Sequence, residues 1–140
     1  MNGTSTVEAE KLEAWTNKAR QQAAKNIELL VSNGTLIAAD KFIGSLGWNR
    51  QALGKAQKAQ RVFSVEIKGE IYYPAFFVDP LYDRRQLEAV SKALGDLPGT
   101  SKLQFMLTPK GSLDSLTPLQ ALAKGKYADV KGAAKGFAQR

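Results

Sequence analysis

The chain contains neither cysteine nor histidine. It therefore has no disulfide and no thiol nucleophile, and it lacks the commonest metal ligand and general base. Its glycines are scattered singly, so it has no glycine-rich phosphate loop. No apolar run approaches the roughly 18 residues of a membrane span, and MNGTSTVEAEK has no basic region followed by an apolar one, so we expect no signal peptide. We therefore expect a cytoplasmic protein that is not an enzyme, with no cofactor, no metal site and no membrane partner.

Acidic residues are absent from residues 41–65, in a chain of 140 residues whose net charge is +7. The basic excess lies in residues 31–70 and 102–140, whereas the first 30 residues are balanced. A hydrophobic content of 44% and a charged content of 24% are ordinary for one compact globular body. This charge distribution suits a polyanionic partner, although a solvated lysine surface would give the same total.

Residues 50–60 predict a helix with two unlike sides. Asn49 is a favourable N-cap, and the segment contains no proline and no β-branched residue. At about 100° per residue, small apolar residues form one side of this helix. These are Ala52, Leu53, Ala56 and Ala59, and the cationic, amide-rich side holds Arg50, Gln51, Gly54, Lys55, Gln57, Lys58 and Arg61.

The cationic side has the chemistry that recognises double-stranded DNA. Arginine and lysine bind guanine edges or phosphates, and glutamine can bind adenine through two hydrogen bonds. We expect the strongest contribution from Arg50, Gln51, Lys55 and Lys58. The full set of expected DNA contacts is Asn49, Arg50, Gln51, Lys55, Lys58, Arg61 and, on phosphate at the tip of a hairpin, Lys68.

The flanking residues predict a winged helix-turn-helix. Upstream, residues 36–46 place Phe42, Ile43 and Leu46 at helical spacing, and Gly47 suits a left-handed turn between helices. Downstream, residues 62–67 alternate, residues 68–70 form a turn, and residues 71–73 return before Pro74. A basic helix after a glycine turn also occurs in helical domains that bind no DNA. The predicted hairpin, which would be the wing, favours the DNA-binding interpretation.

The N-terminal segment predicts one long helix, from a capping box at residues 5–8 to Val31. It has a narrow apolar stripe with steps of three or four residues. Two interpretations remain open, a dimer arm or a helix folded back on its own domain. The stripe consists of Leu12, Trp15, Ala19, Ala23, Ile27 and Leu30.

Further helices are predicted after the hairpin and its apolar cluster at residues 75–78. Asp83 precedes residues 84–94, residues 101–107 form another helix, and Thr117-Pro118 starts a short one. The last, residues 127–138, has Tyr127, Val130, Ala134 and Phe137 on one side and Lys131 and Lys135 on the other. Asp79, Asp83 and Glu88 are interpreted as caps and solvated residues. The expected fold is mostly α, with a helical arm (1–33), a winged helix-turn-helix (34–78) and a C-terminal helical region (79–140).

Two segments carry a family resemblance. LGWNRQALGKAQKAQRVFSVEIKGEIYYPAFFVDP and LTPLQALAKGKYADVKGAAKGFAQR together resemble the bacterial Xre/MbcA/ParS-like antitoxin family, in which RQAL and YYPAF are the more distinctive motifs. Trp48-Asn49 stands where the family more often has Val-Ser, and asparagine caps a helix as well as serine does. The resemblance implies DNA binding at the operon of a toxin and its antitoxin. It also implies a cognate toxin protein as partner, bound through Tyr127, Val130, Lys131 and Phe137.

The sequence therefore predicts a homodimeric, sequence-specific regulator that binds double-stranded DNA and is nucleoid-associated when bound. The alternative is a protein-interaction module that neutralises a toxin without significant DNA binding. An RNA-binding interpretation would require exposed aromatic residues for base stacking. Tyr72 and Tyr73 are the candidates, but their position before Pro74 favours packing.

Overall fold

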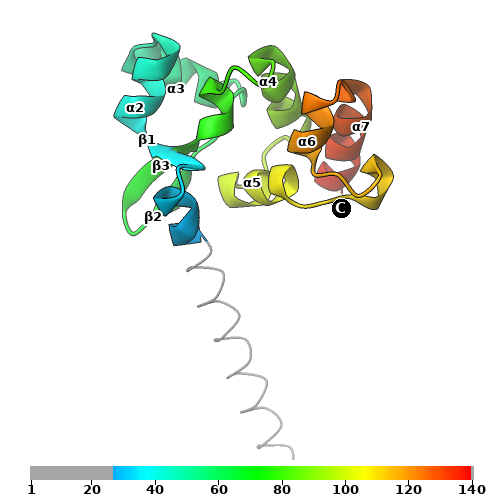
Figure 1. Cartoon of the computed structure of the whole chain (residues 1–140). Helices are drawn as coiled ribbons and strands as arrows, with labels where there is room; N and C mark the ends of the chain where they lie inside the picture. Colours follow the sequence, from blue (N-terminus) through cyan, green and yellow to red (C-terminus); the bar gives the residue numbers. More distant parts are fainter. Residues whose placement is uncertain (1–26, 140) are drawn as a thin grey trace, which may run out of the picture.

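The computed structural model describes residues 27–139, which form a mostly helical body with one small sheet (Figure 1). Residues 27–32 are helical and lead into the first strand. The elements that follow are β1 (Leu36–Ala38), α2 (Ala39–Leu46), α3 (Arg50–Lys58), β2 (Val65–Ile67), β3 (Glu70–Pro74), η1 (Ala75–Val78), α4 (Arg84–Ala93), α5 (Gly99–Leu107), η2 (Gly111–Leu113), α6 (Pro118–Ala123) and α7 (Tyr127–Ala138). The predicted fold class is confirmed.

Helices α2 and α3 form the predicted helix-turn-helix. Gly47 has a φ of 70°, in the left-handed region, and ends α2. The Trp48 amide donates to the carbonyl oxygen of Ile43 at 2.9 Å, which turns the chain toward α3. Asn49 then caps α3, because its Oδ1 accepts from the amide of Ala52 at 2.7 Å.

The sheet is antiparallel, with strand order β1-β3-β2. The β2–β3 hairpin closes through Lys68 and Gly69, whose φ values of 53° and 83° match a two-residue turn of type I′. Strand β1 differs from the sequence prediction, which placed residues 36–38 in a helix. It forms because Leu36 and Ile37 are buried opposite Pro74 and Tyr73 of β3, a pairing between distant residues.

An aromatic cluster joins the helix-turn-helix to the sheet. Phe42 of α2 stacks on Tyr73 of β3 with ring centroids 4.7 Å apart, and it meets Phe77 of η1 edge-on. Phe63, which precedes β2, packs on Phe77 at 5.6 Å. Phe42 is fully buried. Residues 34–78, called the winged part below, therefore pack around this aromatic cluster.

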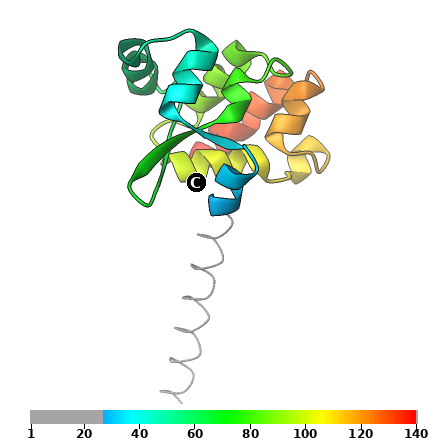
Figure 2. The same ribbon diagram turned by 60° about the vertical axis from the view of Figure 1, so that its left-hand side comes forward.

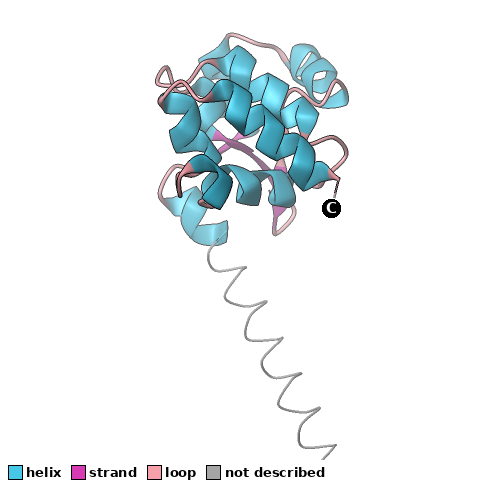
Figure 3. Cartoon of the chain, turned by 90° about the vertical axis from the view of Figure 1, so that its right-hand side faces the viewer, coloured by secondary structure: helices cyan, strands magenta, loops and turns pink. Residues whose placement is uncertain are grey.

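The C-terminal helices continue the same core. One cluster of buried hydrophobic residues runs from Leu36 to Ala134, across the predicted boundary at residue 79. Asp83 caps α4 and Thr117 caps α6 in a capping box with Gln120, as their sequences predict. Helix α7 packs against α4 and α6. From the side of these helices, the strands lie behind them (Figure 3).

Most of the predicted N-terminal helix lies outside the described residues. Of its apolar stripe, only Ile27 and Leu30 are described, and both pack half-buried against the core. Between residues 27 and 139, no helix combines the length and apolar character that crossing a membrane would require.

Candidate nucleic-acid interface

Helix α3 presents an exposed polar side over a buried apolar one. Leu53 and Ala56 are buried, and they hold the helix on the core. Gln51, Lys55 and Lys58 are exposed. Among residues 27–139, neither of these two lysines forms an ion pair with an acidic group. Their charges are therefore available to an external anion.

The predicted cation Arg50 already has an acidic partner. Its Nη2 lies 2.6 Å from Oδ1 of Asp40, in the first turn of α2, and both side chains are well exposed. The stretch without acids begins at residue 41, so this partner stands just outside it. An exposed pair of this kind contributes about 0–1 kcal/mol, so an external anion can replace Asp40 at little cost.

Arg61 lies beside α3 and faces the neighbouring helix. Its Nη1 is 3.7 Å from Oε1 of Glu88 in α4, and its side chain is half-buried. Arg84, one turn before Glu88 in α4, approaches the other oxygen of Glu88 at 3.6 Å. Arg61 therefore helps to join α3 to α4 and is less available for DNA than Lys55 or Lys58.

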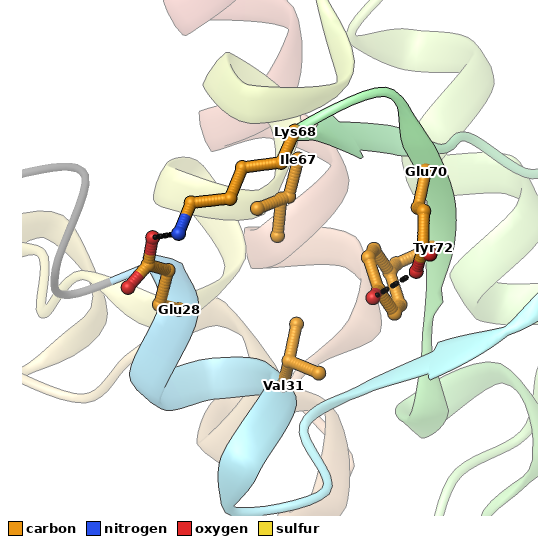
Figure 4. A pocket seen from close by; sticks show the side chains of 6 residues that line it. All are labelled: Glu28, Val31, Ile67, Lys68, Glu70 and Tyr72. Carbon is orange, nitrogen blue, oxygen red and sulfur yellow. Dashed lines mark hydrogen bonds and ion pairs between the residues drawn. The ribbon is translucent and has the colours of Figure 1, made fainter.

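Lys68 at the hairpin tip is separated from the α3 side chains. Figures 1 and 2 both place the tip at the end of the sheet away from α3. The Lys68 Nζ lies 2.9 Å from Oε1 of Glu28, across a pocket that Val31, Ile67 and Tyr72 also line (Figure 4). The structure therefore does not place Lys68 in one cluster with Lys55 and Lys58.

Gln57 does not belong to the exposed side, although the helical wheel placed it there. Its Nε2 donates to Oγ of Ser64 at 3.2 Å, and its Oε1 accepts from the hydroxyl of Tyr73 at 3.1 Å. The reason is that its two partners, Ser64 just before β2 and Tyr73 in β3, lie against this turn of the helix. Burial raises the pKa of Tyr73, which stays protonated as the donor. Gln57 positions α3 on the hairpin.

The positions of Tyr72 and Tyr73 decide whether they could stack on RNA bases. Tyr73 is buried and stacked on Phe42, and the hydroxyl of the half-buried Tyr72 donates to Glu70 at 2.7 Å. Tyr73 is therefore unavailable as a platform for bases.

The N-terminus of α4 adds arginines that the sequence analysis did not select. The Arg84 guanidinium lies 5.4 Å from the centre of the Trp48 ring, directly before the cap of α3. Arg85 is exposed on the same turn. The α4 sequence reads as an ordinary capped helix, so nothing local indicates that its first turn lies beside the start of α3.

The four predicted partner-binding residues of α7 differ in their exposure to solvent. Val130 is completely buried, so it belongs to the core and is unavailable to a partner. Phe137 packs on Phe105 with ring centroids 5.3 Å apart, and Lys110 lies 5.1 Å from both rings. The Lys131 Nζ is 5.9 Å from the centre of the Tyr127 ring. Tyr127, Lys131 and Phe137 remain half-exposed and already have contacts within the chain.

The carboxylates after the hairpin have structural roles. Asp79 accepts from the amide of Leu81, Asp83 accepts from the amide of Arg85, and Glu88 faces two arginines. Within the described residues, no group of three or more aspartates and glutamates is arranged to hold a metal ion.

In comparisons with known proteins, no family model, no curated protein and no solved structure matches this chain.

Proposed function

We propose that the chain is a sequence-specific regulator that reads double-stranded DNA with α3. The observation that supports this most directly is the exposed side of α3, where Gln51, Lys55 and Lys58 stand together without an acidic partner among the described residues. The helix begins after a helix-turn-helix turn and rests on a hairpin. A helix held in this way can enter the major groove with its first turns at the base edges.

The side chains have separate roles in this proposal. Lys55 and Lys58 supply the attraction to phosphate, which releases counterions and is independent of sequence. Gln51 and Arg50 lie in the first turn of α3, where they discriminate between bases. The arginines of α4, Arg84 and Arg85, contact the backbone next to the groove that α3 occupies.

The test begins with a duplex selected by the full-length protein from a random-sequence pool. Gln51→Ala should weaken binding to this duplex by about 1–3 kcal/mol, and binding to a scrambled duplex should hardly change. Gln139→Ala, at an exposed glutamine directly after α7, is the matched control and should bind both duplexes as the wild type does. A pool without enrichment, or a Gln51→Ala protein that prefers the selected duplex as strongly as wild type, would contradict the proposal.

We further propose that two copies bind together, because one helix-turn-helix reads only a few base pairs. Support comes from Ile27 and Leu30, which line an apolar groove of about 640 Å³ with Leu103 and Leu107. Half-sites should then lie about 10 base pairs apart, or a multiple of this. Light scattering on the full chain is the measurement, and a monomer at micromolar concentration would contradict this part of the proposal.

A further inference from the structure

A polar pocket of about 280 Å³ lies between the C-terminal end of α3 and the start of α5. Pockets that hold small molecules typically measure about 300–1,000 Å³, so this one suits a compound of amino-acid size. Its walls come from segments far apart in the sequence. The polar side chains that line it are Gln57, Gln60, Ser64, Asp96 and Lys102.

Lys102 is the unusual member, because its side chain carries a charge and only 3% of the residue is exposed. Its Nζ donates to the carbonyl oxygen of Ser91 at 3.1 Å, which is its one hydrogen bond among the described residues. An ammonium group has three N–H donors. Burial lowers the pKa of Lys102, and the nearby Asp96 opposes that shift. The wall of the pocket thus holds a buried donor with unused capacity.

The N-terminus of α5 adds a second attraction for an anion at the same place. Pro98 occupies the N-cap and makes no side-chain capping bond, so no such bond satisfies the first amides of this nine-residue helix. Gly99, its first residue, lines the pocket together with Lys102. Free amides and the helix dipole both favour a negative group at a helix N-terminus. Two independent features therefore favour a negatively charged group on the ligand.

Asp96 supplies the opposite charge on the rim. It is exposed, its Oδ1 accepts from Nε2 of Gln60, and a carboxylate can accept further hydrogen bonds. The negative charge of Asp96 acts to raise the pKa of Lys102, yet the two side chains form no ion pair. A pocket with separated positive and negative groups is complementary to a ligand that carries both charges.

We propose that this pocket binds a free α-amino acid. The carboxylate of the ligand contacts Lys102 Nζ and the N-terminus of α5, and its ammonium group contacts Asp96. None of these pocket residues is among the proposed DNA contacts.

The position of the pocket also links it to α3, a consequence that rests on the proposed function. Ser91 accepts from Lys102 through its carbonyl, and its Oγ donates to the carbonyl oxygen of Gln60 at 2.7 Å. Gln60 directly follows the last turn of α3. A ligand on Lys102 is therefore two hydrogen bonds, Lys102 to Ser91 and Ser91 to Gln60, from the end of α3. If the two sites are coupled, each ligand changes the affinity for the other by the same factor.

The experiment measures thermal unfolding of the full-length protein with each of the twenty L-amino acids at millimolar concentration. At least one should raise Tm, because a ligand that binds only the folded state stabilises it. For the strongest binder, the analogue with a carboxamide in place of the carboxylate and the analogue without the amino group should each lose the shift. No shift with any amino acid would overturn the proposal.

Two variants locate the site. Lys102→Met keeps the length and apolar stem of the side chain, and Asp96→Asn changes only an exposed charge. Each should weaken amino-acid binding, measured by calorimetry, by about tenfold or more, since hydrogen bonds to charged groups are the stronger kind. If Lys102→Met does not fold, Asp96→Asn still decides the matter. Unchanged affinity in Asp96→Asn would overturn the assignment.

The same preparations separate this proposal from the DNA-binding one. Binding of the selected duplex without any response to amino acids overturns the pocket assignment alone. An amino-acid response that both pocket variants lose, in a protein that binds no duplex, supports the pocket and contradicts the role of α3.

Discussion

Helices α3 and α7 are both amphipathic, with apolar residues on one side and lysines on the other, but the fold places them differently. In α3, Leu53 and Ala56 are buried, and the opposite side is uncovered. In α7, Val130 and Ala134 are buried in a helix that packs against α4 and α6. Its two aromatic side chains also have partners inside the chain. Both helices bury one side and expose the other. They differ in the charge of the exposed side, which includes Asp129 in α7 and has no acidic residue in α3.

The different placement of the two helices follows from where each occurs in the chain. Helix α3 stands at the edge of the winged part, where a turn and a hairpin support it from one direction (Figures 1 and 2). Helix α7 comes last among the described elements, and it covers the apolar side that α4 would otherwise expose. We therefore expect changes in α7 to act on stability and changes in α3 to act on binding.

The largest effect is expected from a charge in the buried side of α7. Val130→Asp places a carboxylate where no part of the side chain is exposed, and it should cost about 4 kcal/mol or more or prevent folding. Ala128→Asp, at an exposed position of the same helix, is the control and should have little effect. Urea unfolding followed by circular dichroism measures both. A stable Val130→Asp protein would remove the distinction between the two helices.

A smaller effect is expected where the winged part meets α5. A Cβ on Gly99 would lie 1.8 Å from the carbonyl oxygen of Ser64, so Gly99→Ala must push two backbone segments apart. The expected loss is about 1–3 kcal/mol. Gly132→Ala in α7 meets no atom within 4 Å, and it should stabilise the helix by about 0.5–1 kcal/mol. Urea unfolding measures both variants. A Gly99→Ala protein more stable than the wild type would contradict the close approach of Gly99 to Ser64.

The lysines of the two helices should differ in DNA binding. Lys55→Ala or Lys58→Ala should weaken binding to all duplexes and reduce the slope of log affinity against log salt by about 1. Lys124→Ala and Lys135→Ala remove exposed lysines near or within α7 and should leave the slope unchanged. Fluorescence anisotropy at several salt concentrations measures these slopes. Equal losses at all four positions would mean that the surface attracts DNA without a preferred side.

The smallest effect concerns the start of α7. The Lys126 Nζ donates to Oδ2 of Asp114 at 2.9 Å, and this bond lowers the pKa of Asp114. A carboxylate whose pKa is lowered by folding stabilises the protein above its unfolded pKa of about 3.9, and the contribution disappears as pH falls through the folded pKa. Asp114→Asn should therefore lower the urea midpoint slightly at pH 7, and the difference should disappear once acid protonates Asp114 in the folded protein. A difference that grows in acid would contradict the assigned pair.

Much of the fold could be predicted because the signals are local. Asn49, Asp83 and Thr117 accept bonds from amides two or three residues away, so each marks a helix start in any context. Gly47 and the Lys68-Gly69 turn act through their own backbone angles. Strand β1 was missed because it exists only through pairing with β3, some 35 residues later.

The sequence predicted which side of α3 is exposed, but it assigned Gln57 to that side in error. The exposed positions of Gln51, Lys55 and Lys58 follow from helical spacing, since their side lies opposite the apolar residues. The inward position of Gln57 depends on the strand segment that follows α3.

The sequence by itself therefore determined where α3, α4 and α6 begin and which side of α3 is basic, because these features depend on residues within a turn or two. Only the tertiary structure decided which charges remain available and which apolar sides are buried. The pair Asp40–Arg50 joins two helices, and the pair Glu28–Lys68 and the pocket at Lys102 join segments that are far apart in the chain. Local spacing carries no information about such contacts, because they arise only when the elements pack around a common core.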